Sequence, residues 1–126
     1  MTRAMLFAPP GYWRMSPEHR AEVCNGCGTK GLCGYVIPDT IWFLSIKVAC
    51  DIHDFMYATG LTAEDKIVAD RVFLYNMQRL IAAGWQWKWL MRRRTNLAEI
   101  YYDFVVKRGG PAFWAGKNRP EEMGTV

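Results

Sequence analysis

The chain has no long hydrophobic segment. None of its 126 residues belongs to a run of about 18 apolar residues, so we expect no membrane-spanning helix. Near the start, the apolar residues 5–8 are followed at once by Pro9, Pro10 and Gly11, so no secretory signal is expected either. Any contact with lipid should therefore be peripheral. The chain as written is expected to be cytoplasmic, already trimmed, or exported by another route.

Cysteine is also scarce. The four cysteines are too few for a disulfide-rich scaffold, and all of them lie in the first half of the chain: Cys24, Cys27, Cys33 and Cys50. They could form up to two disulfides, a metal site, or neither. Internal repeats and low-complexity segments are absent from the sequence.

What the chain does contain is a core-forming composition with a one-sided charge. Hydrophobic residues make up 51%, which is typical of one folded domain of this length. The net charge is +4, but residues 1–65 carry 5 Lys and Arg against 7 Asp and Glu, whereas residues 66–126 carry 11 against 5. A basic C-terminal half favours an anionic partner, either a lipid surface or nucleic acid.

The order of turn signals and apolar periodicity predicts a mostly helical, all-α domain. Thr62 and Asp65 have the spacing of a helix capping box, and Gly60 ends the preceding helical pattern, which starts after Pro38. A further helix should begin near Asn96. The single domain 1–126 is predicted to contain an irregular arm (1–23), a Cys- and Gly-rich loop (24–34), a helix pair (39–84), an aromatic and basic helical segment (85–108) and a loose tail (115–126).

Polar residues stand on a helix face that should be buried. Cys50, His53, Asp54 and Tyr57 follow each other at helical spacing, so their side chains share one face of the first helix of the pair. An imidazole, a carboxylate and a phenol need hydrogen-bonding partners when they are buried. This face is therefore the candidate site of the chain.

The second helix offers the partner. Asp70 is in phase with the apolar residues Ile67, Phe73 and Met77, which places it on the inward face. Antiparallel packing across the short turn at Gly60 would bring Asp70 to His53, with Tyr57 as a second donor. Such contacts would hold the imidazole in one tautomer and orientation, as a general base requires.

Asp54 has a candidate role of its own. It projects about a hundred degrees round the helix from His53 and could face the Cys- and Gly-rich loop 24–34. Calcium is bound by carboxylates together with backbone carbonyls, and a glycine-rich loop opposite one carboxylate can supply both. Asp54 is thus the candidate metal-binding carboxylate.

These motifs resemble those of a known family. Asn25-Gly26-Cys27-Gly28, followed by Cys50, His53, Asp54 and Tyr57 in the pattern Cys-x-x-His-Asp-x-x-Tyr, is similar to phospholipase A2. Ala69-Asp70-Arg71-Val72-Phe73, with Met77 after it, resembles the bacterial and fungal branch of that superfamily. The resemblance covers roughly residues 24–78.

The resemblance implies a fold, an activity and a set of roles. The fold would be two long antiparallel helices joined by a disulfide, Cys27 to Cys50, to a calcium loop, with additional C-terminal helices; Cys24 and Cys33 could also pair. The activity would be hydrolysis of the sn-2 ester of glycerophospholipids in aggregates or at a membrane surface. His53 would be the base, Asp70 would orient it and Tyr57 would bind Asp70. Asp54 would bind Ca²⁺ with the loop residues Asn25, Gly26 and Gly28.

Other interpretations remain open at this point. The chain could be a catalytically silent phospholipase A2-like module, such as a toxin or phage component, that binds membrane or protein. The four cysteines could bind zinc. Nucleic-acid binding has no recognisable motif behind it. The segment containing Trp85, Trp87, Trp89 and Arg92 to Arg94 could dock on a lipid interface, although we expect at least one set of these tryptophans to lie in the core.

Overall fold

The computed structural model describes residues 6–19, 37–115 and 117. The described part is mostly helical, in agreement with the expected class. None of its helices combines the length and the apolar character needed to cross a bilayer. Its elements are α1 (Pro10–Arg14), β1 (Thr40–Ile41), β2 (Leu44–Ser45), α4 (Lys47–Thr59), α5 (Ala63–Ala83), α6 (Lys88–Arg108) and α7 (Gly110–Trp114).

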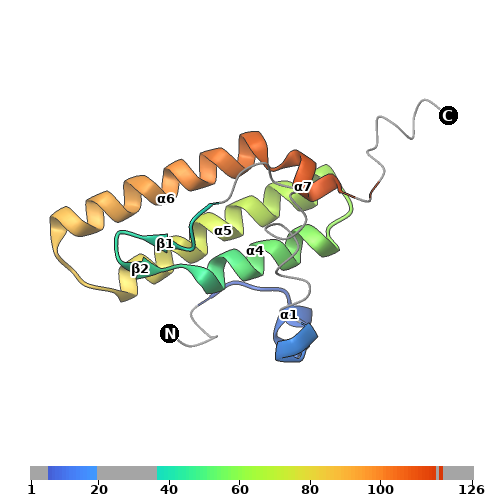
Figure 1. Ribbon diagram of the computed structural model, residues 1–126, viewed down its shortest axis with the longest axis horizontal. Helices are drawn as coiled ribbons and strands as arrows, with labels where there is room; N and C mark the ends of the chain where they lie inside the picture. Colours follow the sequence, from blue (N-terminus) through green and yellow to red (C-terminus); the bar gives the residue numbers. More distant parts are fainter. Residues whose placement is uncertain (1–5, 20–36, 116, 118–126) are drawn as a thin grey trace.

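Three helices form the body of the molecule, and α5 lies between the other two. Consecutive helices run in opposite directions, so α4 and α5 form the antiparallel pair that the Gly60 turn predicts (Figure 1). α5 packs against both α4 and α6, and the short helix α7 lies at the end where α6 finishes. Positions on the inward face of α5 can therefore contact two helices at once.

The start of α5 is set locally. Thr62 is its N-cap, and its hydroxyl accepts a hydrogen bond from the Asp65 amide at 3.1 Å. The Asp65 carboxylate in turn accepts hydrogen bonds from the amides of Thr62 and Leu61, at 3.0 and 2.8 Å. The predicted capping box is confirmed, and it satisfies amides that the first turn of a helix leaves without partners.

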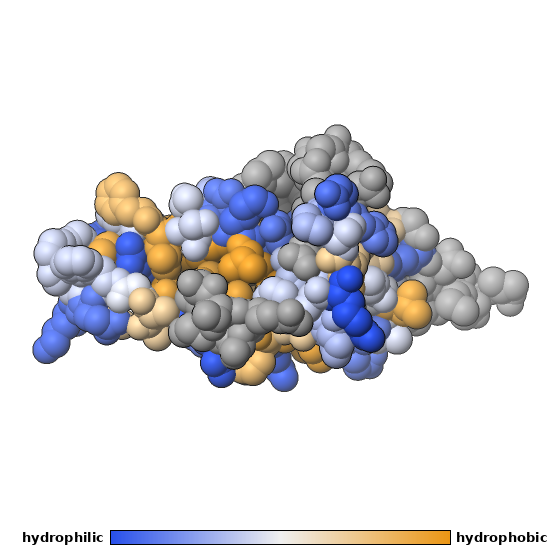
Figure 2. All heavy atoms as spheres, turned by 90° about the horizontal axis from the view of Figure 1, so that it is seen from below, coloured by the Kyte–Doolittle hydropathy of each residue, from blue (hydrophilic) through white to orange (hydrophobic). Residues whose placement is uncertain are grey.

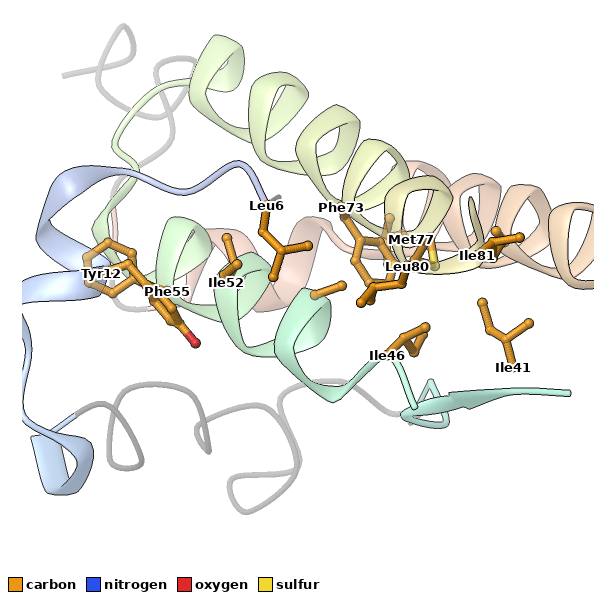
Figure 3. Close-up of a cluster of buried hydrophobic side chains, with 13 residues drawn as sticks. Leu6, Tyr12, Ile41, Ile46, Ile52, Phe55, Phe73, Met77, Leu80 and Ile81 are labelled. Carbon is orange, nitrogen blue, oxygen red and sulfur yellow. The ribbon is translucent and has the colours of Figure 1, made fainter. Parts of the chain in front are cut away.

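The core lies between α5 and the two helices that flank it, α4 and α6, and the N-terminal segment closes it on the α4 side. Figure 3 shows Leu6 between the side chains of α4 and those of α5, and Tyr12 beside Phe55. The Tyr12 and Phe55 rings meet edge to face, with centroids 5.6 Å apart. Side chains of the buried cluster include Ile46, Ile52, Phe73, Met77, Leu80 and Ile81.

A buried amide fixes the N-terminal segment to α5. The side-chain carbonyl of Asn76 accepts a hydrogen bond from the Phe7 amide at 2.7 Å, and its NH₂ group donates to the Phe7 carbonyl at 2.8 Å. Asn76 has no exposed surface, so this pair of bonds satisfies a polar group that would be costly to bury alone. The described residues of the predicted arm, 6–19, pack on the domain, and they are not irregular throughout, because Pro10–Arg14 form the short helix α1. On this side of the molecule, apolar atoms lie along the middle of the face with hydrophilic atoms around them (Figure 2).

The first helix of the pair begins later than predicted. Residues 40–45 form a two-stranded hairpin in which Ile41 pairs with Leu44, and the helix starts only at Lys47. The two turn residues, Trp42 and Phe43, have positive φ angles of 42° and 70°. Such angles in bulky residues cost on the order of 1–3 kcal/mol each. The hairpin persists because Ile41 is buried in the core and because Arg94 of α6 holds its turn.

The aromatic and basic segment also differs from the prediction. α6 starts at Lys88 rather than near Asn96, so most of this segment belongs to one helix of 21 residues. Trp85, Trp87 and Trp89 are all exposed, so the expectation that one set of them lies in the core is wrong. Ile67, which was expected to face inward with Asp70, is exposed as well.

Several predictions concern residues outside the described part of the chain. They are the calcium loop with Asn25, Gly26 and Gly28, any role of Cys24, Cys27 and Cys33, including zinc binding, and most of the tail 115–126.

Candidate functional site

His53 and Asp70 lie against each other in the interior, one on α4 and one on α5. His53 Nε2 is 2.8 Å from Asp70 Oδ1, and the Tyr57 hydroxyl donates to the same oxygen at 2.6 Å. All three side chains are buried, with 7% of His53 and 2% of Asp70 exposed. The contacts expected from helical spacing and antiparallel packing are therefore present.

Lys66 binds the second oxygen of the same carboxylate. Its Nζ donates to Asp70 Oδ2 at 2.8 Å, and also to the carbonyls of Val105 and Val106 at 3.1 and 3.4 Å. Lys66 lies one turn before Asp70 on α5, while the carbonyls belong to the last turns of α6. The ammonium group thus connects the His53 site to the third helix of the body.

Aromatic rings enclose the imidazole. The Phe73 ring stacks on His53 with centroids 4.6 Å apart and an interplanar angle of 28°. Tyr57 packs on the imidazole at 4.1 Å, and Phe113 of α7 meets the Tyr57 ring edge to face at 5.3 Å. These contacts hold the imidazole in place and exclude water from the hydrogen bond to Asp70.

Burial and hydrogen bonding determine which of the two groups is charged. Burial lowers the pKa of His53, and this effect outweighs the hydrogen bond and the charge of Asp70, which act to raise it. Burial acts to raise the pKa of Asp70, but the hydrogen bonds from His53, Lys66 and Tyr57 together hold it below its ordinary value. The site therefore contains a neutral imidazole, an ionised carboxylate and a lysine cation.

The hydrogen bond to Asp70 selects the tautomer of His53. An ionised carboxylate can only accept, so the proton of the neutral ring lies on Nε2 and the lone pair on Nδ1. Among the described residues, no side chain or backbone group is hydrogen-bonded to Nδ1. A buried imidazole with its free lone pair on one nitrogen and a carboxylate on the other has the arrangement of a general base.

Gly109 leaves room for the Tyr57 hydroxyl. A Cβ atom built at Gly109 would collide with the hydroxyl oxygen of Tyr57 and would lie 2.5 Å from the carbonyl oxygen of Val105. The sequence predicts Gly109 only as the end of a helix. In the structure it also allows the backbone after α6 to approach the site closely.

Asp54 is partly buried on α4, next to His53 in sequence. Burial raises the pKa of Asp54 to about 7; the charge of Asp51 acts in the same direction and that of Lys47 in the opposite one. Within the described residues, Asp54 receives no hydrogen bond and forms no ion pair. A carboxylate held out of water without a donor suits a hard divalent cation, so the residue present fits calcium.

A complete metal site is not formed by the described residues. They contain no group of three or more His, Cys, Asp or Glu side chains that could hold a metal ion. The further ligands predicted from the sequence, the loop residues Asn25, Gly26 and Gly28, lie outside them. The calcium site therefore stays a prediction in which Asp54 is the one described ligand.

Cys50 precedes His53 by one helical turn. It is a free cysteine in the structure, and burial, together with the charges of Asp54, Asp51 and Asp39, raises the pKa of its thiol to about 12. Such a thiol remains protonated and is a poor nucleophile. Its predicted disulfide partner, Cys27, is outside the described residues, so the pairing is still a prediction.

Two residues of the site were not identified from the sequence. Lys66 precedes Asp70 by four residues, a spacing that places two helical side chains together, and this signal was available. Gly109 was visible only as a helix stop, because its contact with Tyr57 depends on how α6 packs.

Comparisons of the chain with protein-family models, with curated proteins and with solved structures found no match. Function therefore has to be inferred from the geometry of the buried site and from the motifs of the sequence.

Proposed function

We propose that the chain is a calcium-dependent, phospholipase A2-like hydrolase that cleaves the sn-2 ester of glycerophospholipids at a lipid surface. One observation carries the proposal: His53 is buried, neutral and hydrogen-bonded through Nε2 to the ionised Asp70, with no partner on Nδ1 among the described residues. Such a pair is suited to activating a water molecule.

In the proposed reaction His53 first accepts a proton and then donates it. Nδ1 takes a proton from water while the water oxygen bonds to the ester carbonyl carbon, giving a tetrahedral intermediate. The ester C–O bond then breaks, and the leaving alkoxide takes the proton back from the imidazolium. The products are a fatty acid and a lysophospholipid, and the histidine returns to its neutral form.

Asp70 acts through His53. Its carboxylate keeps the ring in one tautomer and stabilises the imidazolium that forms when Nδ1 is protonated. Tyr57 and Lys66 each donate to Asp70, at 2.6 and 2.8 Å, so the carboxylate cannot rotate away from the imidazole. We assign His53 as the residue that moves the proton, and Asp70, Tyr57 and Lys66 as residues that position and stabilise it.

The proposed calcium ligands are Asp54 and the backbone of the loop residues Asn25, Gly26 and Gly28. The chemistry that calcium supplies when bound is polarisation of the ester carbonyl and stabilisation of the negative charge that develops on its oxygen. For Asp54 the consequence is that its partly buried carboxylate acquires a counter-ion.

Fatty-acid release from phospholipid vesicles tests the proposal. The chain offers a matched control, because it has two histidines and the second, His19, is exposed. Loss of a general base costs about 10²–10⁴-fold, so His53→Asn should lose at least 100-fold in rate while His19→Asn keeps full activity. A chelator should remove the activity of the wild type. Equal rates for the two variants would overturn the assignment of His53, and activity in chelator would remove calcium from the mechanism.

A catalytically silent phospholipase A2-like module is the second candidate. The observation that favours it is the ion pair of Lys66 with Asp70, since this pair alone would explain why the carboxylate can be buried. The silent module predicts no ester hydrolysis with or without calcium, together with retained binding to membrane or protein.

A further inference from the structure

One end of the helical body carries a group of exposed aromatic side chains. The hairpin turn and the connection between α5 and α6 both lie at this end (Figure 1, left). In Figure 2 the same end shows pale and light-orange atoms next to hydrophilic ones. We call this group the aromatic end; all of its members are exposed, and they are Trp42, Phe43, Trp85, Trp87 and Trp89.

The hairpin holds its aromatic turn away from the core. Phe43 is 90% exposed, the highest exposure among the large hydrophobic residues described, and it stands in a backbone conformation that bulky residues rarely adopt. The buried Arg94 donates to the Trp42 carbonyl from Nε and Nη2, at 3.0 and 2.9 Å. The Tyr101 hydroxyl donates to the Thr40 carbonyl at 3.1 Å. Arg94 and Tyr101, both on α6, therefore keep the turn in place with the Phe43 ring in solvent.

The tryptophans beside the turn form one cluster. The Trp87 ring meets Trp85 edge to face at 5.3 Å and stacks with Trp89 at 6.0 Å. Arg94 lies close to the cluster as well as to the hairpin. A Cβ atom built at Gly84, the residue before Trp85, would be 3.2 Å from its Nη1. Arg93 completes the link, with its guanidinium 5.2 Å from the centre of the Trp42 ring.

The charged residues of the segment that contains the three tryptophans are all basic. From residue 72 to residue 98 the chain contains no acidic residue, and its basic residues there are Arg79, Lys88, Arg92, Arg93 and Arg94. Lys88, Arg92 and Arg93 are exposed next to the tryptophans. The surface from which the aromatic rings project therefore attracts anionic groups.

We propose that the aromatic end is the surface by which the protein binds an anionic phospholipid bilayer. Indole rings favour the headgroup zone, a protruding phenylalanine gains from burial among acyl chains, and each basic residue is attracted to anionic headgroups. Proteins that bind single-stranded nucleic acid combine stacked rings with a basic groove along the backbone. Here the most exposed ring, Phe43 at the hairpin turn, is almost entirely in solvent, which suits insertion into lipid better.

This surface is separate from the catalytic residues. Asp70 lies on α5, and Gly84 directly follows its last residue. The two positions are fourteen residues apart, which corresponds to about 20 Å along the helix. The choice of lipid as the partner rests on the proposed function, which is hydrolysis of phospholipid. The proposed surface concerns adhesion alone, so binding and hydrolysis can be measured separately.

The test is sedimentation with vesicles of ether-linked phospholipids, which contain no ester to cleave, with and without anionic phosphatidylglycerol. Phe43→Gly is the key variant, because glycine adopts a positive φ without strain and the fold should be retained. The double variant Phe43→Gly, Trp87→Ala should bind anionic vesicles at least tenfold more weakly than the wild type. Arg92→Gln alone should weaken this binding roughly fivefold. Ile100→Ala removes an exposed apolar side chain elsewhere on α6 and serves as the control, with no change expected.

Hydrolysis of a dispersed short-chain phospholipid separates the two proposals. The Phe43 and Trp87 variants should keep the wild-type rate on this substrate, since neither residue contacts the His53 site. Failure of all proteins to hydrolyse it would overturn the hydrolase but not the binding surface. Unchanged vesicle binding in the Phe43 and Trp87 variants would overturn the surface. The membrane surface would also be overturned if the wild type does not bind vesicles but binds a labelled single-stranded oligonucleotide, and the variants lose that binding. This result would identify a nucleic-acid surface.

Discussion

Removing the Lys66 ammonium tests how the buried carboxylate is stabilised. Lys66→Met keeps a long, unbranched side chain but deletes the donor that lies 2.8 Å from Asp70 Oδ2. Asp70 Oδ1 keeps its two donors, His53 and Tyr57, whereas Oδ2 loses the one donor that the described residues provide. The variant therefore leaves an ionised carboxylate half satisfied in the interior.

The expected cost follows from the exposure of the pair. Deleting one partner of a fully buried ion pair costs about 3–5 kcal/mol, and losing a hydrogen bond to a charged group about 1.5–3 kcal/mol. The Asp70 side chain is only 3% exposed, but the Lys66 side chain is 14% exposed, so water can reach part of the space that the ammonium leaves. We therefore expect a loss of about 2 kcal/mol in the free energy of unfolding.

Lys107→Met is the matched control. Lys107 forms the same type of pair, four residues from Asp103 on one helix at 3.0 Å, but its two side chains are 68% and 61% exposed. Exposed pairs of this kind contribute less than about 0.5 kcal/mol. The two pairs have the same chemistry and differ in burial, and Lys66→Met also removes the donor to the Val105 and Val106 carbonyls.

Equilibrium denaturation in urea, followed by circular dichroism at pH 7, measures both free energies. Adding Asp70→Asn to Lys66→Met completes a double-mutant cycle, which should give a coupling of at least about 1 kcal/mol between the two positions. If Lys66→Met costs no more than Lys107→Met, or if the cycle gives no coupling, the ion pair does not stabilise the buried site and the reasoning is refuted.

Three further predictions concern the surroundings of the site. Gly109→Ala should lower the free energy of unfolding by about 1–3 kcal/mol in thermal denaturation, because its Cβ would meet the Tyr57 hydroxyl, whereas Gly110→Ala has open space and should be nearly neutral; equal effects would contradict the contact. Thr62→Ala removes the capping box of α5 and should cost about 1 kcal/mol in urea denaturation, and a neutral result would rule out the cap. The lowered pKa of Asp70 means that the unfolded chain binds its proton more readily, so the contribution of Asp70 to stability is present above about pH 4 and is lost as the pH falls through its folded-state value. Asp70→Asn should flatten this decline in denaturation series at different pH, and an unchanged slope would show that Asp70 is not its source.

The helix pair and its buried dyad were largely determined by the sequence. Helical spacing sets which side chains share a face, and a short turn forces consecutive helices to pack antiparallel. These two local rules were sufficient to bring His53 and Tyr57 to Asp70, and the Thr62 capping box set where α5 begins. Interactions of this kind join residues near in sequence or related by one turn, so they can be predicted from the sequence.

Only the tertiary structure decided the features that depend on distant partners. The hairpin replaces a predicted helical turn because Arg94, 52 residues away, binds the Trp42 carbonyl. The spacing of Lys66 and Asp70 was visible in the sequence, but the α6 carbonyls that Lys66 also binds, about 40 residues further along the chain, depend on how α6 packs. Ile67 has the helical phase of an inward residue yet is exposed. Spacing places a side chain on a face of its helix, whereas burial depends on which other elements pack against that face.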